Sequence, residues 1–184
     1  EDGIITVSRA EGTLTYPASF ILVASKNPCP CGFSTDTDRQ CVCSASQILN
    51  YRKKISGPLL DRIDLHVEVP RVHFDKLTSE ELPEPSKIIQ LRVANARLIQ
   101  TVRFKNSKIH TNGEMGNKEI RTFCKLDEES VQLLRSAVMQ MHLSARSYNR
   151  ILKVSRTIAD LDNKNNIQLS HIAEALQFRA PSEA

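Results

Sequence analysis

The sequence has no apolar run long enough to cross a membrane. Its longest candidate, Phe20 to Ser25, has the length of a strand, whereas a membrane-spanning helix needs about 20 residues. A basic segment followed by an apolar one, as in a secretory signal, is also missing. The five cysteines are an odd number, which argues against a disulfide framework and for reduced thiols. We therefore expect a cytoplasmic protein with no membrane partner.

Several catalytic motifs are missing as well. No Gly-x-x-x-x-Gly-Lys-Ser/Thr loop is present to cradle a phosphate, and no predicted strand ends in the paired acids that would hold Mg²⁺. Neither a Ser-His-Asp order nor a His-Glu-x-x-His zinc motif occurs. Taken alone, the chain therefore lacks the parts for phosphoryl transfer.

What remains is an ordinary globular composition. The chain has 184 residues, of which 40% are hydrophobic and 25% charged. This length allows one domain, or a core with a small appendage. The net charge of +4 is too small by itself to indicate nucleic acid. The first residue is not Met and a strand pattern follows almost at once, so we expect a piece of a longer protein.

Residues 1–80 have an α/β pattern. Alternating residues predict a hairpin over 4–17, and a continuous apolar run predicts a buried strand over 20–24. A short helix is expected over 44–55, and period-two alternation predicts another strand over 63–69.

Residues 81–184 follow as an all-helical part, after an acidic connector over 71–85. Apolar residues at three- and four-residue steps predict its helices. Their expected N-caps are Ser86, Asp127, Ser144 and Ser170, with a further short helix around Ile120.

Four of the cysteines form two close pairs: Cys29 with Cys31, and Cys41 with Cys43. Four thiolates can bind Zn²⁺ tetrahedrally, and such a site would be structural because no coordination position stays open. The Cys-x-Cys spacing is tighter than the usual knuckle. Reduced thiols without metal, or disulfides formed only on oxidation, are the alternatives. The fifth cysteine, Cys124, is interpreted as a small buried side chain.

Three polar residues have two interpretations each. Asn27 follows the apolar run, where an amide can position a water or touch a phosphate, but it can equally be a turn residue. Arg62 lies between Asp61 and Asp64, where a local ion pair is the alternative to a functional role. Arg146 begins a helix on its polar face, where a solvated charge is the ordinary case.

One stretch of the helical part contains basic residues but no acidic ones. Residues 86–110 contain six lysines and arginines and no Asp or Glu. A stretch of one charge sign attracts phosphates, although the commoner reason for such a stretch is a solvated surface. Arg9 at the hairpin tip is one more exposed cation.

These features occur in an order that resembles one family. The resemblance rests on the strings Ile5-Thr-Val-Ser-Arg-Ala10, Phe20-Ile-Leu-Val-Ala-Ser-Lys-Asn27-Pro-Cys-Pro-Cys-Gly32, Cys41-x-Cys43-Ser44, Ser56-Gly-Pro-Leu-Leu-Asp61-Arg62-Ile-Asp-Leu65, Leu143-Ser-Ala-Arg146 and Arg156-Thr-Ile-Ala-Asp160-Leu161. Over nearly its whole length, the chain resembles the carboxyl-terminal portion of the magnesium-chelatase-related AAA+ ATPases of bacteria, the YifB/ComM group.

The resemblance implies a role for each residue. Asn27 matches sensor 1, which orients the attacking water, and Arg62 matches the arginine finger that reaches the neighbouring subunit's nucleotide. Arg146 matches sensor 2 of the lid. The hairpin matches the presensor-1 insertion, which would make Arg9 a DNA-facing cation.

The resemblance also implies the architecture. Residues 1–80 would be part of an AAA+ P-loop core with the hairpin and parallel strands, and residues 81–184 an all-α lid domain. The Walker A and Walker B strands would precede residue 1, so we expect no ATP hydrolysis by this chain alone.

Three functions remain open. The first is a hexameric ATPase that uses ATP and Mg²⁺ to remodel DNA, as in branch migration during competence and recombination. The second is a chelatase-type motor that remodels a partner protein. The third is a zinc-stabilised nucleic-acid-binding module.

Overall fold

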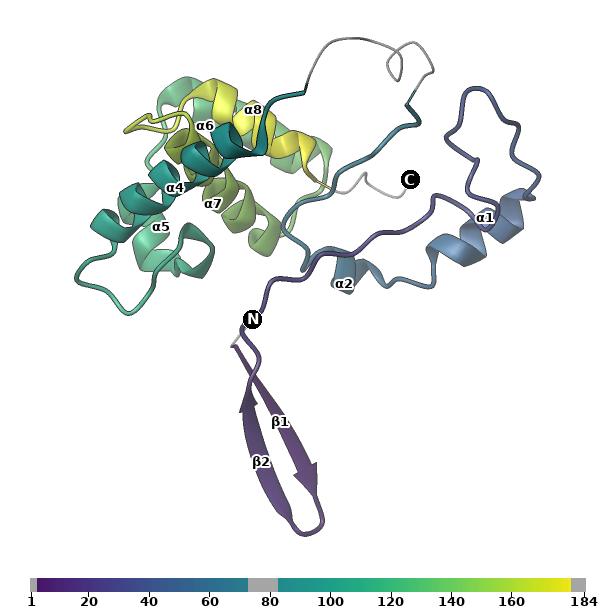
Figure 1. Cartoon of the computed structure of the whole chain (residues 1–184), viewed down its shortest axis with the longest axis horizontal. Coiled ribbons are helices and arrows are strands. Elements are labelled where there is room, and N and C mark those ends of the chain that lie inside the picture. Colours follow the sequence, from purple (N-terminus) through teal and green to yellow (C-terminus); the bar gives the residue numbers. More distant parts are fainter. Residues whose placement is uncertain (1–2, 73–82, 180–184) are drawn as a thin grey trace. The chain divides into compact units, whose positions relative to one another are not determined.

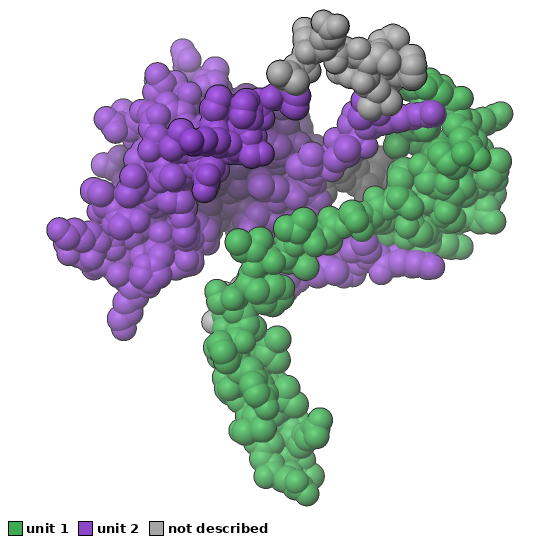
Figure 2. Space-filling view, in the orientation of Figure 1, with its two compact units in different colours: residues 1–52 green, residues 53–184 purple. Residues whose placement is uncertain are grey.

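The chain divides into two compact units, Glu1–Arg52 and Lys53–Ala184 (Figures 1 and 2). The computed structural model describes residues 3–72 and 83–179. Within these ranges, no helix is both long enough and apolar enough to cross a membrane. The connector predicted over 71–85 lies largely outside the described residues, and the functional boundary predicted between residues 80 and 81 stays a prediction.

A two-stranded hairpin begins the first unit. Strand β1, Ile4–Arg9, pairs antiparallel with strand β2, Gly12–Pro17, in a register that places Thr6 opposite Thr15 and Arg9 opposite Gly12. The hydroxyl oxygens of Thr6 and Thr15 lie 3.4 Å apart, which adds a cross-strand contact to the backbone ladder. This confirms the predicted hairpin. Helix α1, Ala45–Arg52, ends the unit and confirms the predicted short helix.

The two further strands predicted from the sequence are not formed, and this expectation was wrong. Residues 20–24 and 63–69 have no strand assignment, and the sheet among the described residues consists of β1 and β2. Ile21 is 93% exposed and Val69 is 86% exposed. Apolar and alternating patterns give a segment the propensity for a strand, but the strand itself needs a hydrogen-bonded neighbour.

The second unit is helical, and the elements over residues 83–179 agree with the helical pattern predicted beyond residue 80. It begins with the four-residue helix α2, Gly57–Leu60. The later elements are α4 (Ser86–Arg103), the 3₁₀ turn η1 (Asn112–Glu114), α5 (Asn117–Phe123), α6 (Glu128–Gln140), α7 (Ala145–Leu161) and α8 (Leu169–Gln177).

Two of the four predicted helix caps are confirmed. The side chain of Asp127 accepts a hydrogen bond from the backbone N–H of Ser130, and that of Ser144 accepts one from the N–H of Ser147. The other two predictions were wrong, because the N-cap position of α4 is held by Pro85, which makes no side-chain capping bond, and that of α8 by Gln168. Ser86 and Ser170 lie inside their helices, where a serine side chain cannot serve as the N-cap.

Helix α7 is the centre of the helical unit and contacts α4, η1, α5 and α8 (Figure 1). Ile151, Leu152 and Ala159 on one of its faces are at most 3% exposed. They pack with Leu134 of α6 and Ile172 of α8 in one hydrophobic core. This face is the apolar stripe that the 3.6-residue period of the sequence predicts.

A buried charged cluster joins α7 to α4 and η1. The side chain of Asp160 is fully buried and accepts hydrogen bonds from Arg103, Asn112 and Arg156. Arg156 also donates to the carbonyl oxygens of Asn165, at 2.8 Å, and Lys164, at 2.6 Å. Burial lowers the pKa of Arg156. The cluster places two guanidinium groups around one carboxylate inside the helical unit.

Candidate functional site

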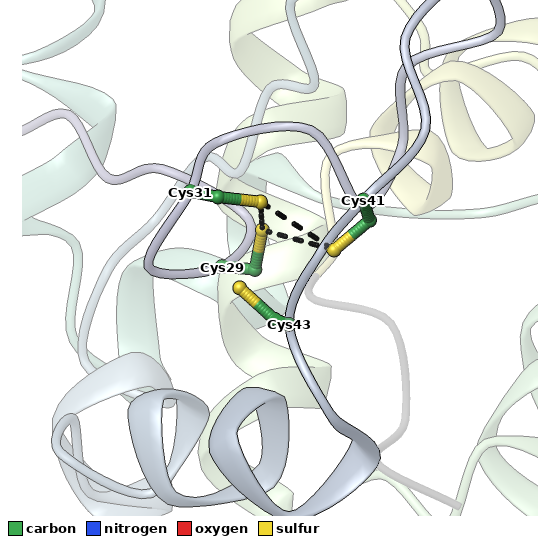
Figure 3. Close-up of side chains that lie close together, drawn as sticks. All are labelled: Cys29, Cys31, Cys41 and Cys43. Carbon is green, nitrogen blue, oxygen red and sulfur yellow. Dashed lines mark hydrogen bonds between the residues drawn. The ribbon is translucent and has the colours of Figure 1, made fainter.

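The four paired cysteines converge in the loop that precedes α1 (Figure 3). The Sγ atoms of Cys29 and Cys31 are 3.4 Å apart, and Cys41 Sγ lies 3.7 Å from the first and 3.5 Å from the second. All four Sγ atoms, including that of Cys43, lie within 4.8 Å of one another. The loop thus brings together cysteines that are up to 14 positions apart in the chain.

These distances suit a zinc ion. Four thiolates at about 2.3 Å from a tetrahedral Zn²⁺ have sulfur atoms about 3.8 Å apart. The three separations among Cys29, Cys31 and Cys41 are between 3.4 and 3.7 Å, and those to Cys43 are within 4.8 Å, so shifts of the side chains by a few tenths of an ångström to about 1 Å would give this geometry. Cys29 is fully buried, which suits a closed structural site rather than a catalytic one.

The thiol pKa values show how the four cysteines affect one another's ionisation. Burial raises the pKa of Cys29, but hydrogen bonds from Cys31 and Ser34 outweigh it and bring the value to about 6. Burial and the neighbouring cysteines raise the pKa of Cys43 to about 12. One thiolate therefore opposes the formation of the next, as like charges at short distance do. A divalent cation removes this repulsion, because thiolates are its ligands.

Asn27 and Arg9 belong to the same unit as the cysteines, and both are exposed. Asn27 lies two residues before Cys29, at the beginning of the cysteine loop. It does not follow a strand, because residues 20–24 are not paired. Arg9 ends β1 at the two-residue turn of the hairpin, opposite Gly12.

Arg62 lies in the helical unit, two residues beyond the end of α2, and is exposed. Its Nη1 donates a hydrogen bond to the carbonyl oxygen of Pro58 at 2.7 Å. The local ion pair considered from the sequence is wrong. Asp61 pairs with Arg179 at 3.2 Å and Asp64 with Arg150 at 3.4 Å, so both neighbouring carboxylates have other cationic partners.

Asp61 is a residue whose contacts the sequence analysis missed. Its carboxylate accepts hydrogen bonds from the hydroxyls of Ser144, at 3.1 Å, and Ser147, at 2.8 Å. Arg179 Nη2 donates to the same carboxylate. These partners lie 83 or more residues later in the chain, so no local pattern indicates them. The sequence offered one signal: Asp61 is an acid next to Arg62, and Ser144 is a serine at the predicted beginning of a helix.

Arg146 is exposed and lies in the first turn of α7, beside Ser147. The structure therefore brings the neighbours of Arg62 and Arg146 into direct contact: Asp61, which precedes the first, binds Ser147, which follows the second. Asn27, Arg9 and the cysteines lie in the other unit.

The basic stretch over residues 86–110 is less available than its composition indicates. Arg103 is paired with the buried Asp160, and Arg92 contacts Glu84 at 2.6 Å. The other four, Lys87, Arg97, Lys105 and Lys108, are exposed on α4 or in the loop that follows it. Two of its six cations thus have structural partners.

Comparison with known proteins gives matches along almost the whole chain. Residues 1–77 match the family model described as magnesium chelatase, subunit ChlI, and residues 83–179 match the model of the carboxyl-terminal part of the same subunit. Together these models cover both compact units.

Curated relatives match over nearly the same extent. The competence protein ComM of Haemophilus influenzae is 42% identical over 181 residues, which are 98% of this chain and 34% of the relative. The protein YifB of Escherichia coli is 39% identical, over 98% of this chain and 35% of its own length. A protein of Mycobacterium tuberculosis is 35% identical over 97% of the chain. The chain thus spans about a third of the length of the relatives it matches.

Proposed function

This chain belongs to the magnesium chelatase ChlI family, and from that premise we propose that it forms part of a ring-shaped, hexameric AAA+ ATPase that remodels DNA. The observation that carries the proposal is the 42% identity to a competence protein across 98% of the chain. Competence is the uptake of DNA, so the remodelled substrate would be DNA, for instance a branched recombination intermediate.

Three exposed polar residues would act on bound ATP. Asn27 would orient the attacking water, and Arg146 would contact the phosphates of the same subunit's ATP. Arg62 would reach the nucleotide of the neighbouring subunit and neutralise charge that develops during hydrolysis. Bound Mg²⁺ would supply positive charge that offsets the negative charge of the phosphates. The exposure of Arg62 and Arg146 on the surface of the helical unit supports these roles.

The hairpin would contact DNA, and the cysteine loop would stabilise the fold. A cation at an exposed hairpin tip, as Arg9 is, suits contact with a DNA phosphate. The cysteine cluster would bind one structural Zn²⁺ that orders the loop between residues 28 and 44, directly after Asn27. Zinc would thereby fix the backbone on one side of the proposed sensor.

A second candidate is a chelatase-type motor that remodels a partner protein. The descriptions of both matching family models favour it. It shares the ATPase and the ring with the first proposal and differs only in the substrate.

Substitution of Arg62 tests the ATPase proposal in the full protein to which this chain belongs. Arg62→Ala should reduce ATP hydrolysis by about 10³- to 10⁵-fold, the usual range for an arginine finger, while ATP still binds. Arg121→Ala, another exposed arginine of the helical unit, is the matched control and should hydrolyse ATP at the wild-type rate. Normal hydrolysis by Arg62→Ala would refute the assignment.

A further inference from the structure

Asp61 connects two parts of the helical unit that are distant in sequence. It directly follows α2 and precedes Arg62. Its Oδ2 accepts a hydrogen bond from the Ser144 hydroxyl at 3.1 Å, and its Oδ1 accepts one from Ser147 at 2.8 Å. Arg179, just beyond α8, donates from Nη2 to Oδ1 at 3.2 Å. The carboxylate is thus held from the beginning of α7 and from the end of α8.

The surroundings favour the ionised carboxylate. Ser144 is the N-cap of α7, so Asp61 lies at the positive end of a 17-residue helix. The Ser147 hydroxyl, with smaller contributions from Ser144 and two arginines, lowers the pKa of Asp61. The side chain of Arg179 is 6% exposed and that of Asp61 is 34% exposed. The contact is therefore shielded on the arginine side, where screening by water is weak.

A second set of contacts fastens the backbone beside Asp61. Arg150 Nη1, from the second turn of α7, donates to the Asp61 carbonyl oxygen at 2.9 Å and lies 3.4 Å from the Asp64 carboxylate. The backbone N–H of His66 donates to the carbonyl oxygen of Phe178 at 2.8 Å. Residues 61–66 are thus attached at both ends to the α7–α8 pair, although they form no strand.

We propose that Asp61 is a positioning residue that locks Arg62 to the first turn of α7, so that Arg62 and Arg146 move as one body. This inference rests on the proposed function, in which Arg146 contacts the nucleotide of its own subunit and Arg62 that of the neighbour. A shift of α7 when nucleotide binds at Arg146 is then transmitted through Ser147 and Asp61 to Arg62. Each site would report its occupancy to the next one around the ring.

Asp61→Ala in the full protein tests the lock. Hydrolysis should slow about 10- to 100-fold, the effect of misplacing a catalytic group, while affinity for a fluorescent ATP analogue stays within about twofold of wild type. Any cooperativity of hydrolysis with ATP concentration should fall, because the coupling between sites is removed. Asp127→Ala is the matched control: it removes a capping carboxylate from α6, far in sequence from Arg62, and should hydrolyse ATP as wild type does.

The double variant Asp61→Ala/Arg62→Ala separates positioning from general stability. If Asp61 acts through Arg62, the double variant hydrolyses ATP no more slowly than Arg62→Ala alone, since the two effects are not additive. Multiplying effects, or an Asp61→Ala variant that matches Asp127→Ala, would overturn the proposal. Should Asp61→Ala fail to fold, Asp61→Asn keeps an acceptor for the serines but loses the charge that faces Arg179, and the same comparisons apply.

The Arg62→Ala and Asp61→Ala variants distinguish failure of the proposed function from failure of the lock. A normally active Arg62→Ala protein contradicts the proposed function and the inference together. An inactive Arg62→Ala with an Asp61→Ala that behaves like the control contradicts the inference alone.

Discussion

Removing the charge of Asp160 should strongly destabilise the helical unit. Asp160→Asn keeps the size of the side chain but leaves two guanidinium groups, of Arg103 and Arg156, around a neutral amide. The side chains of these arginines are 12% and 3% exposed, and that of Asp160 is 0% exposed. Breaking a buried pair by removing one partner costs about 3–5 kcal/mol, because a buried charge is left uncompensated.

The lower end of that range is the better expectation for this cluster. Arg156 keeps its hydrogen bonds to the carbonyl oxygens of Asn165 and Lys164 after the substitution. Arg103 is slightly exposed and can recover part of its hydration. We therefore expect a loss of about 3 kcal/mol in the free energy of unfolding, which lowers the melting temperature by roughly 6–12 °C for a chain of this size.

Urea unfolding followed by circular dichroism measures this loss, because most helical residues lie in the second unit. Glu84→Gln is the control: it breaks the pair with Arg92, whose side chains are 47% and 45% exposed, and should cost about 0–1 kcal/mol. If Asp160→Asn is no more destabilising than this control, the buried charges contribute far less than argued.

Two further predictions concern the first unit. Metal analysis of the purified protein should give about one zinc per chain, which is lost in Cys31→Ser. Cys124→Ala should keep the zinc, since Cys124 lies in the helical core and not in the cluster. Zinc bound equally by both variants would contradict the proposed ligands. Arg9→Ala should weaken DNA binding by the full protein and reduce the salt dependence of its affinity by about one phosphate contact. An unchanged salt dependence would remove Arg9 from the DNA surface.

The parts that sequence predicts well are those decided by neighbouring residues. The hairpin follows from alternation around a two-residue turn, and α6 and α7 follow from a capping residue before a 3.6-residue apolar period. Each needs only contacts within the element or a few residues beyond it. The same holds for the approach of two Cys-x-Cys pairs, since a short loop joins them.

The parts that sequence predicts poorly depend on distant partners. Residues 20–24 have the composition of a buried strand, but only a neighbouring strand would make them one. The distant partners of Asp61 and Asp160 are separated from them by up to 118 and 57 residues. The local pair of Asp160 with Arg156, four residues earlier, has the spacing of an ordinary surface pair on a helix and does not reveal that the acid is buried. The roles of Asn27, Arg62 and Arg146 came from family resemblance and stay predictions.

ATP hydrolysis by the full protein, measured with and without branched DNA, tests the central claim most directly. Hydrolysis that rises strongly when branched DNA is added is the result that a DNA-remodelling ATPase predicts. Hydrolysis that is the same with and without DNA would contradict the DNA substrate and favour remodelling of a partner protein. A full protein that does not hydrolyse ATP at all would contradict the account as a whole.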